Sequence, residues 1–250
     1  MEEQEKRDSV AVVVPSLNPD RRLRSTVEGL LSAGFTDVIL VNDGSSPETL
    51  EHFQALAHLP EVTLLSHAVN RGKGAALKTA FSWLLEHRPF CAGVVTVDGD
   101  GQHHPEDAAA CARQMLAEER VILGCRDFSR PEVPPRSWMG NRITSAVFHI
   151  FCGMKISDTQ TGLRAIPRRD LAVMAAVAGE RYEYETNMLL VLKDRHIPYG
   201  EAPIRTIYLE ENRGSHFHAV RDSWRIYRLI LAHFFRYTLS SLASAAADTG

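Results

Sequence analysis

Cysteine is scarce in this sequence and forms no recognisable pattern. The four cysteines, Cys91, Cys111, Cys125 and Cys152, are scattered, and no two of them form a CxxC pair. Zinc sites need closely paired ligands, and disulfide frameworks belong to small secreted domains. We therefore expect neither a zinc site nor a disulfide framework, and we predict a protein of the reducing cytosol.

The chain also lacks a strong net charge and a long apolar run. Its formal net charge of −3 gives no indication of nucleic-acid binding. The polar start MEEQEKRDS is not typical of a secretory signal peptide. No stretch reaches the ~18–20 apolar residues of a membrane-spanning helix, and the nearest approach, at 226–247, is interrupted by Arg228, His233 and Arg236. The length of 250 residues suits one α/β domain with a short appendage.

Apolar runs alternate with helical patterns along the chain. Buried strands are predicted at 9–14, 37–41, 62–65, 92–98 and 121–124, the first of them stopped by Pro15. Helices are predicted at 21–33 (ended by Gly34), 76–85, 104–116, 141–151, 183–196 and 219–238. The proline-rich stretch 129–142 is predicted to be a mobile loop. Strands alternating with helices predict βαβ units and a mainly parallel sheet.

Polar residues follow four of these predicted strands. Asn18, Asp43, Asp98 and Arg126 each come just after an apolar run. Ligands of open α/β sheets bind beyond the carboxyl ends of the strands. The sequence therefore predicts a site where these four residues converge.

The segment VDGDGQHH (97–104) concentrates oxygen ligands in a glycine-rich turn. Asp98, Asp100 and Gln102 alternate there, and hard oxygen donors suit Mg²⁺ or Mn²⁺ shared with substrate phosphates. A solvated turn is the alternative, because Asp and Gly are ordinary turn residues. The position of the segment after a buried strand favours the metal site.

Eight motifs occur in order along the chain: PSLN (15–18), VNDGSS (41–46), NRGKGAAL (70–77), VDGDGQH (97–103), GCRD (124–127), SDTQTGLR (157–164), RYEYETNML (181–189) and ENRGSHF (211–217). Together they resemble the family-2 inverting glycosyltransferases, above all the dolichyl- and polyprenyl-phosphate sugar synthases. The resemblance covers roughly residues 9–238. It implies a GT-A fold, a Rossmann-like, mostly parallel sheet flanked by helices, with a C-terminal amphipathic helix.

The resemblance also implies roles for individual residues. The donor nucleotide would be bound by Pro15, Leu17, Asn18, Asp43, Gly72, Lys73, Asp98 and Gly99. Asp100 and Gln102 would hold the metal. The acceptor phosphate would be bound by Arg126, Arg136 and Asn141, and Arg213, Ser215 and His216 would close over the diphosphate. Asp100, Arg126 and Arg213 would be the catalytic residues. Two departures from the family pattern are Pro19 after the asparagine and a histidine at position 216, where many relatives have lysine.

Several residues have a structural reading beside the functional one. NRGKGAA could contact phosphate through Arg71 and Lys73, or could simply begin a helix. Asp158 and Arg164 could form an ion pair inside a turn. Glu183 and Glu185 lie two positions apart, so one helix face cannot present both; either one lies near a substrate sugar, or both cap the helix that follows. His103 and His104 could extend the metal shell or flank a helix at the surface.

The chain is expected to divide into a catalytic domain at 1–218 and a helical extension at 219–250. Arg221, Arg225 and Arg228 form a basic row on the predicted last helix, which could lie on an anionic membrane or pack on the domain. The ending YTLSSLASAAADTG resembles the start of a membrane helix in relatives with a fused membrane domain. We therefore expect the native chain to continue, and we expect a location at the cytosolic face of a membrane.

The predicted activity is metal-dependent, inverting transfer of a sugar from a UDP- or GDP-linked donor to a polyprenyl phosphate. One alternative is transfer to a hydroxyl of a saccharide or protein, which would require a catalytic carboxylate near the acceptor. Another is a non-catalytic, regulatory nucleotide-sugar-binding protein, against which the metal motif argues. A nucleotidyltransferase is disfavoured because no glycine-rich, arginine-bearing loop follows the first strand. The sequence leaves the donor base, the sugar and the oligomeric state open, and a homo-oligomer is compatible with it.

Overall fold

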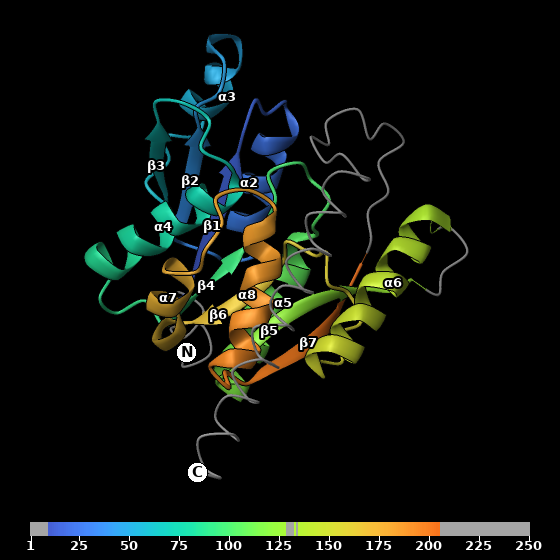
Figure 1. The fold of residues 1–250 in the computed structure, drawn as a ribbon. Coiled ribbons are helices and arrows are strands. Elements are labelled where there is room, and N and C mark those ends of the chain that lie inside the picture. The colour runs from blue at the N-terminus through green and yellow to red at the C-terminus, as the bar shows by residue number, and fades with distance from the viewer. Residues whose placement is uncertain (1–9, 129–132, 134, 206–250) are drawn as a thin grey trace, which may run out of the picture.

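A seven-stranded sheet with helices on both faces forms the centre of the molecule (Figure 1). The computed structural model describes residues 10–128, 133 and 135–205. The strands are β1 (Val10–Ser16), β2 (Val38–Asp43), β3 (Val62–His67), β4 (Gly93–Thr96), β5 (Val121–Arg126), β6 (Arg164–Pro167) and β7 (Tyr199–Ile204). Their order is β3-β2-β1-β4-β6-β5-β7, and only β6 runs antiparallel to its neighbours.

The valine-rich first strand explains why the sheet has two cores. Side chains alternate across a strand, so Val10, Val12 and Val14 enter one apolar cluster while Ala11 and Val13 enter the other. Because both faces are covered, β1 is an unbroken apolar run and not an alternating one.

The helices divide between the two faces of the sheet. On one side lie α2 (Arg22–Ser32), α5 (Pro105–Glu118) and the short η1 (Pro47–Thr49) followed by α3 (Leu50–Gln54). On the other lie α4 (Lys73–His87), α7 (Arg168–Ala175) and α8 (Glu183–Asp194). Figure 1 shows α6 (Pro135–Cys152) beside the β5–β7 edge of the sheet. Its buried residues Phe148 and Cys152 join the apolar cluster that also contains Ala11 and Val13.

The prediction that Pro15 stops the first strand is wrong. β1 continues to Ser16, and Pro15 is paired with Val41 of β2. Residues two apart in a strand direct their backbone groups to the same neighbour, and Val13 accepts a bond from Val97 on the β4 side. The missing N–H of Pro15 therefore points to that side, beyond the last β1–β4 pair, Val13 with Thr96. No ladder bond is lost, so the proline is tolerated.

The predicted loop at 129–142 is also wrong in its second half. α6 begins at Pro135, so residues 135–142, which are predicted to lie in the loop, are helical. Proline is favoured at the first helical position, where its missing N–H would have no intrahelical partner anyway. Proline is also a common loop residue, so the sequence alone does not distinguish the two roles.

Other boundaries agree with the sequence, and some lie outside the described residues. The helix predicted at 21–33 is confirmed as α2, and Gly34 follows its end with a φ of 97°. The predicted helix at 219–238 and the division at 218 both lie outside the described residues. β6, α7 and β7 have no counterpart among the predicted elements. β6 has only four residues, RAIP, with an arginine and a proline among them, which gives little strand signal.

The close approach of α4 to α8 generates a stability prediction for Gly74. A Cβ at Gly74 would lie 2.5 Å from Tyr184 Cβ and 2.9 Å from the backbone carbon of Glu180. Gly→Ala inside a helix normally stabilises by roughly 0.5–1 kcal/mol. Here we expect Gly74→Ala to lower the free energy of unfolding by about 1–3 kcal/mol, because the helices must separate.

Urea unfolding measures this change, with Ser82→Ala on the exposed side of α4 as the control. The control is expected to change stability by less than about 0.5 kcal/mol. A Gly74→Ala protein as stable as the parent would contradict the close packing of α4 on α8.

Candidate active site

The C-terminal ends of β1, β2, β4 and β5 bring most of the described predicted site residues to one edge of the sheet. Pro15 lies in β1 and Asp43 ends β2, while Arg126 ends β5. Leu17 and Asn18 follow β1, and Asp98 follows β4 by two positions. The parallel order of these strands produces this arrangement, as the sequence predicted for an open α/β sheet.

Asp43 holds the segment that leads into α4. Its Oδ1 accepts a hydrogen bond from the backbone N–H of Arg71 at 2.9 Å, and its Oδ2 accepts one from Gly72 at 2.7 Å. Nδ1 of His67 lies 2.7 Å from Oδ1, and Nε2 of the same ring lies 2.9 Å from Thr79 Oγ1. Asp43, which is predicted to bind the donor nucleotide, therefore fixes the glycine-rich loop that leads into α4.

Asn18 connects the turns after β1 and β2. Its Oδ1 accepts the N–H of Ser46 at 2.7 Å, and its own N–H donates to Ser45 Oγ at 2.9 Å. The φ of Asn18 is 47°, a left-handed conformation that asparagine tolerates better than most residues. The amide thus gives the two turns a defined relative position.

Lys73 lies between two carboxylates from different elements. Its Nζ is 2.6 Å from Asp98 Oδ1 and 3.0 Å from Glu185 Oε1 of α8. Burial raises the pKa of Asp98, but the charges of Lys73 and His103 outweigh it, so the pKa lies below its usual range. Burial likewise opposes the charge of Lys73, and the two carboxylates more than offset it, so its pKa is raised.

The acidic turn after β4 carries a charge that is only partly compensated. Asp100 Oδ1 accepts the N–H of Gln102 at 3.1 Å. Burial and the neighbouring Asp98 together raise the pKa of Asp100. A divalent cation would offset this unfavourable negative charge, so Asp100 and Gln102, which offer oxygen ligands, fit a site for a hard metal ion. Within residues 10–128, 133 and 135–205, no group of three or more His, Cys, Asp or Glu side chains is arranged to hold a metal.

His103 contacts the first carboxylate of this turn. Its Nε2 is 3.4 Å from Asp98 Oδ2, and burial lowers the pKa of the ring. His104 has a different position, because its Nδ1 accepts the N–H of Glu106 at 3.4 Å and thereby caps α5. Of the two histidines considered as additions to the metal shell, His103 contacts the acidic turn and His104 caps a helix.

Arg126, predicted to bind the acceptor phosphate, forms an ion pair with Asp158. Its Nε lies 2.6 Å from Oδ2 and its Nη2 3.1 Å from Oδ1 of a carboxylate that is fully buried. The predicted pair between Asp158 and Arg164 is therefore wrong. Arg164 is buried in β6 and donates instead to the backbone oxygens of Glu185 and Thr161. β6 runs back through the sheet and carries Arg164 into the interior, which a turn reading of the motif could not anticipate.

Of the other residues predicted to bind the acceptor phosphate or to close over the diphosphate, only Asn141 has a described side chain. Asn141 is buried in α6; its Nδ2 donates to Ser157 O at 2.6 Å and its Oδ1 accepts the N–H of Thr159 at 3.4 Å. The amide thus joins α6 to the segment that carries Asp158. Arg136 belongs to α6, but its side chain is outside the described part, as are all of Arg213, Ser215 and His216.

The two glutamates of RYEYET have separate roles. Glu183 Oε1 accepts the N–H groups of Glu180 and Arg181, in the segment before α8, at 3.2 and 3.3 Å, whereas Glu185 contacts Lys73. Their spacing of two positions correctly indicated that the two side chains face different ways.

Gly162 is a site residue that the sequence did not predict. A Cβ there would lie 2.5 Å from Asp98 Oδ2 and 2.8 Å from Lys73 Nζ, so the segment 157–164 packs directly over the ion pair of Lys73 and Asp98. Its TGLR context carries no local signal for that contact.

Comparison with known proteins gives one family match. The model of the family described as Glycosyl transferase family 2 matches residues 11–172. An uncharacterized protein of Methanocaldococcus jannaschii is 28% identical over 234 residues, covering 92% of this chain and 94% of that protein. The UDP-N-acetylglucosamine–dolichyl-phosphate N-acetylglucosaminyltransferase of Methanococcus voltae is 26% identical over 240 residues, covering 89% of this chain and 95% of that protein.

Solved structures show the same fold. Glucosyl-3-phosphoglycerate synthase from Mycobacterium tuberculosis, crystallised with Mn²⁺, UDP-glucose and phosphoglyceric acid, aligns with a TM-score of 0.68. The identity is 14%, and the alignment covers 94% of this chain and 82% of that chain. At this identity the likeness speaks for the fold alone, and it confirms the predicted GT-A architecture.

The pair of Arg126 with Asp158 generates a prediction of stability. Asp158→Ala removes the buried carboxylate that pairs with Arg126, and it also removes the acceptor of the Gln160 N–H. We expect a loss of roughly 2–3 kcal/mol in the free energy of unfolding, measured in urea. The control is Glu28→Ala, which breaks the exposed pair with Arg24 and should cost less than about 0.5 kcal/mol. Equal effects of the two changes would show that the buried pair is not stabilising.

Proposed function

This chain belongs to glycosyl transferase family 2, and we propose that it moves a sugar from a UDP- or GDP-linked donor to a polyprenyl phosphate. The observation that carries the proposal is the acidic turn Asp98–Gln102, placed at the carboxyl end of β4 inside the matched family region. The lipid acceptor is supported by the named dolichyl-phosphate transferase, which aligns over almost the whole of both chains.

The donor is proposed to lie over the ends of β1, β2 and β4. Asn18 and Asp43 hold the two turns on one side of this position, and Asp98 lies on the other. These side chains are already fixed by hydrogen bonds to the backbone or by Lys73. Binding of the nucleotide would therefore require little ordering of the protein, which is the basis of preorganisation.

The proposed metal is Mg²⁺ or Mn²⁺, held by Asp100 and Gln102 together with donor oxygens. When bound, such an ion stabilises the charge that develops on the leaving nucleoside diphosphate. Asp100 contributes an ionised carboxylate only after it loses its proton, and its pKa is raised. Proton and metal therefore compete for Asp100, and binding should weaken as the pH falls toward that raised pKa.

The acceptor side is proposed to use arginines to hold a phosphate. A lipid phosphate is largely anionic at neutral pH, its second pKa being about 6, so it needs little help from a general base. Arg126 ends β5 and is held by the buried Asp158. Arg136 follows in α6. Electrostatic holding of the phosphate in line with the sugar would then do most of the work of positioning. Arg213 is proposed to close over the diphosphate.

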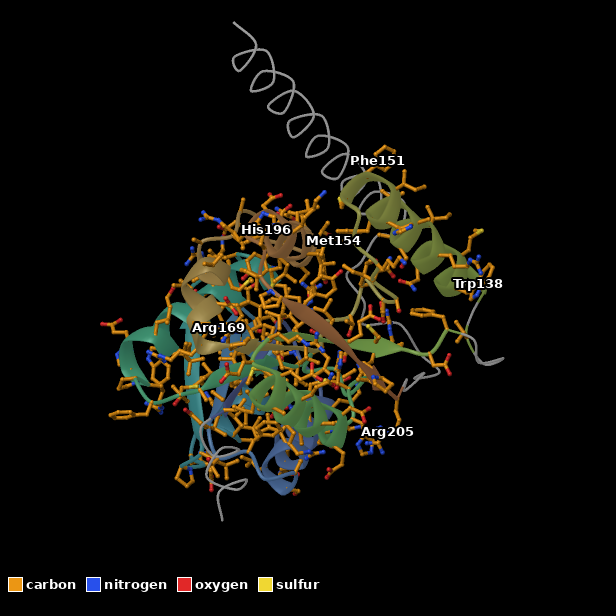
Figure 2. The ribbon with its side chains drawn as sticks, turned by 90° about the horizontal axis from the view of Figure 1, so that it is seen from below. Trp138, Phe151, Met154, Arg169, His196 and Arg205 are labelled. Carbon is orange, nitrogen blue, oxygen red and sulfur yellow. The ribbon has the colours of Figure 1, made fainter. Side chains whose placement is uncertain are left out.

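The outward side of α6 supports contact with a membrane surface. Among the described side chains of this helix, Trp138, Met139, Ile143 and Ile150 are exposed, and Arg142 stacks on Trp138 at 4.9 Å. The sequence of α6 contains no acidic residue. Figure 2 shows α6 at the rim of the molecule, with Trp138 and Phe151 toward its two ends.

An exposed apolar face with basic and aromatic residues is suited to the interface of an anionic bilayer. In the described part of the chain, no helix has both the length and the apolar character of a membrane span.

Calorimetric titration with UDP and with GDP, each with Mn²⁺ and again with EDTA, tests the donor site. We expect one nucleotide to bind only with the metal. Asp100→Asn should weaken that binding by about tenfold or more, because a charged carboxylate ligand is replaced by a neutral amide. The control Glu106→Gln alters an exposed acid in the first turn of α5 and should leave the affinity unchanged. Metal-independent binding would refute the assignment of Asp100, and no binding of either nucleotide would refute the donor site.

Flotation with vesicles of phosphatidylcholine and phosphatidylserine tests the membrane contact. The double change Trp138→Ser with Ile143→Ser removes two exposed apolar side chains from α6 and should reduce binding about tenfold. Phe90→Ser is the matched control, since Phe90 is an exposed aromatic residue between α4 and β4. If both variants float like the parent protein, α6 is not the membrane-facing surface.

A further inference from the structure

We propose that Glu185 is a positioning residue of the donor site, acting through Lys73 on Asp98. The inference rests on the proposed function, because it concerns the same site. It assigns Lys73 to the support of the acidic turn and not to direct contact with the donor diphosphate, the role that the sequence favoured.

Three separate elements meet at this ion cluster. Lys73 is the first residue of α4, Asp98 follows β4, and Glu185 lies in the first turn of α8. The side chains of Lys73, Asp98 and Glu185 are 18%, 29% and 14% exposed. Ion pairs at this degree of burial are screened much less than pairs at the surface. The cluster can therefore transmit the position of α8 to the turn after β4.

The surrounding backbone leaves Lys73 little freedom to move. Nη1 of the buried Arg164 donates to the backbone oxygen of Glu185 at 2.7 Å and fixes that turn of α8. The N–H of Ala75 donates to Glu180 O at 2.9 Å and joins the start of α4 to the residues before α8. Gly162 packs so closely over the pair that even a methyl group would collide with Asp98 and Lys73. The backbone segments that carry Lys73 and Glu185 are thus anchored by hydrogen bonds that do not involve the ion pair itself.

The chemistry of the cluster favours a supporting role for Lys73. An ammonium group has three N–H donors and no acceptor, and two of its neighbours here are carboxylates. One lysine charge between two carboxylates leaves a net negative charge, to which Asp100 adds. That balance suits a divalent cation. If Lys73 instead bound the diphosphate directly, Glu185 would compete with the phosphate for it.

The two roles predict opposite effects of one substitution. If Glu185 positions the site, Glu185→Gln should weaken binding of the Mn²⁺–nucleotide pair by about tenfold, since the anchor of Lys73 loses its charge. If Lys73 is a diphosphate ligand held back by Glu185, the same change should leave binding unchanged or strengthen it. Glu183→Gln is the matched control, because Glu183 lies in the same turn of α8 and accepts the backbone N–H groups of Glu180 and Arg181. It should change the affinity by less than about twofold.

A double-mutant cycle identifies the route of the effect. Lys73→Met should weaken binding, and adding Glu185→Gln to it should weaken binding little further, because both residues act through Asp98. Fully additive effects would overturn the proposal. All affinities are compared in variants whose urea unfolding shows a folded state under the assay conditions. A loss of stability with unchanged affinity would mean a structural role only, and would also overturn it.

A chemical-modification experiment that needs neither nucleotide nor metal tests whether Glu185 holds Lys73. Acylation of lysines, followed by mass spectrometry, should modify the exposed Lys155 readily and Lys73 slowly. Glu185→Gln should raise the rate at Lys73 about tenfold and leave the rate at Lys155 unchanged. An unchanged rate at Lys73 would show that Glu185 does not hold it. If the parent protein bound neither UDP nor GDP, the proposed function would fail; if it bound one of them and Glu185→Gln had no effect, only this inference would fail.

Discussion

Strands β1, β2 and β4 are covered by helices on both faces, so a polar side chain in this part of the sheet can reach a ligand only where a strand ends. This constraint explains the arrangement of the site. The parallel strands end at one edge, and Asp43 and Asp98 lie at or just beyond those ends. The apolar run of β1 that makes the sheet stable is thus also what concentrates the polar chemistry at its edge.

Buried carboxylates at this edge mostly bind the protein itself. Asp43 accepts two backbone N–H groups of the loop before α4, and Asp158 holds Arg126. Each of these contacts satisfies a charge that burial would otherwise make costly. Asp100 differs, because burial and the neighbouring Asp98 raise its pKa and so disfavour its ionised form. Among these three carboxylates, it is the one whose surroundings are best suited to receive a cation.

Segment 157–164 shows how distant parts of the chain complete one another. Asp158 pairs with β5, Gly162 packs on the Lys73–Asp98 pair, and Arg164 anchors the first turn of α8. The antiparallel strand β6 makes this possible, since it inserts between β4 and β5 and directs the segment toward both. The motif and its charged residues are recognisable in the sequence, but the predicted ion pair between Asp158 and Arg164 is wrong. The spacing of residues within a turn carries no information about a strand that runs through the sheet.

By itself, the sequence determined the local and periodic features. The valine-rich runs, the helix ending at Gly34 and the oxygen-rich turn at 98–102 depend on side-chain alternation, turn chemistry and burial, which are properties of neighbouring residues. The family and the GT-A fold also followed from motifs in order. Only the tertiary structure decided that Pro15 stays within a strand, that Asp158 pairs with Arg126, and that Lys73 lies between Asp98 and Glu185. Each of these depends on which elements meet in space, and residues 112 positions apart, such as Lys73 and Glu185, carry no local record of that meeting.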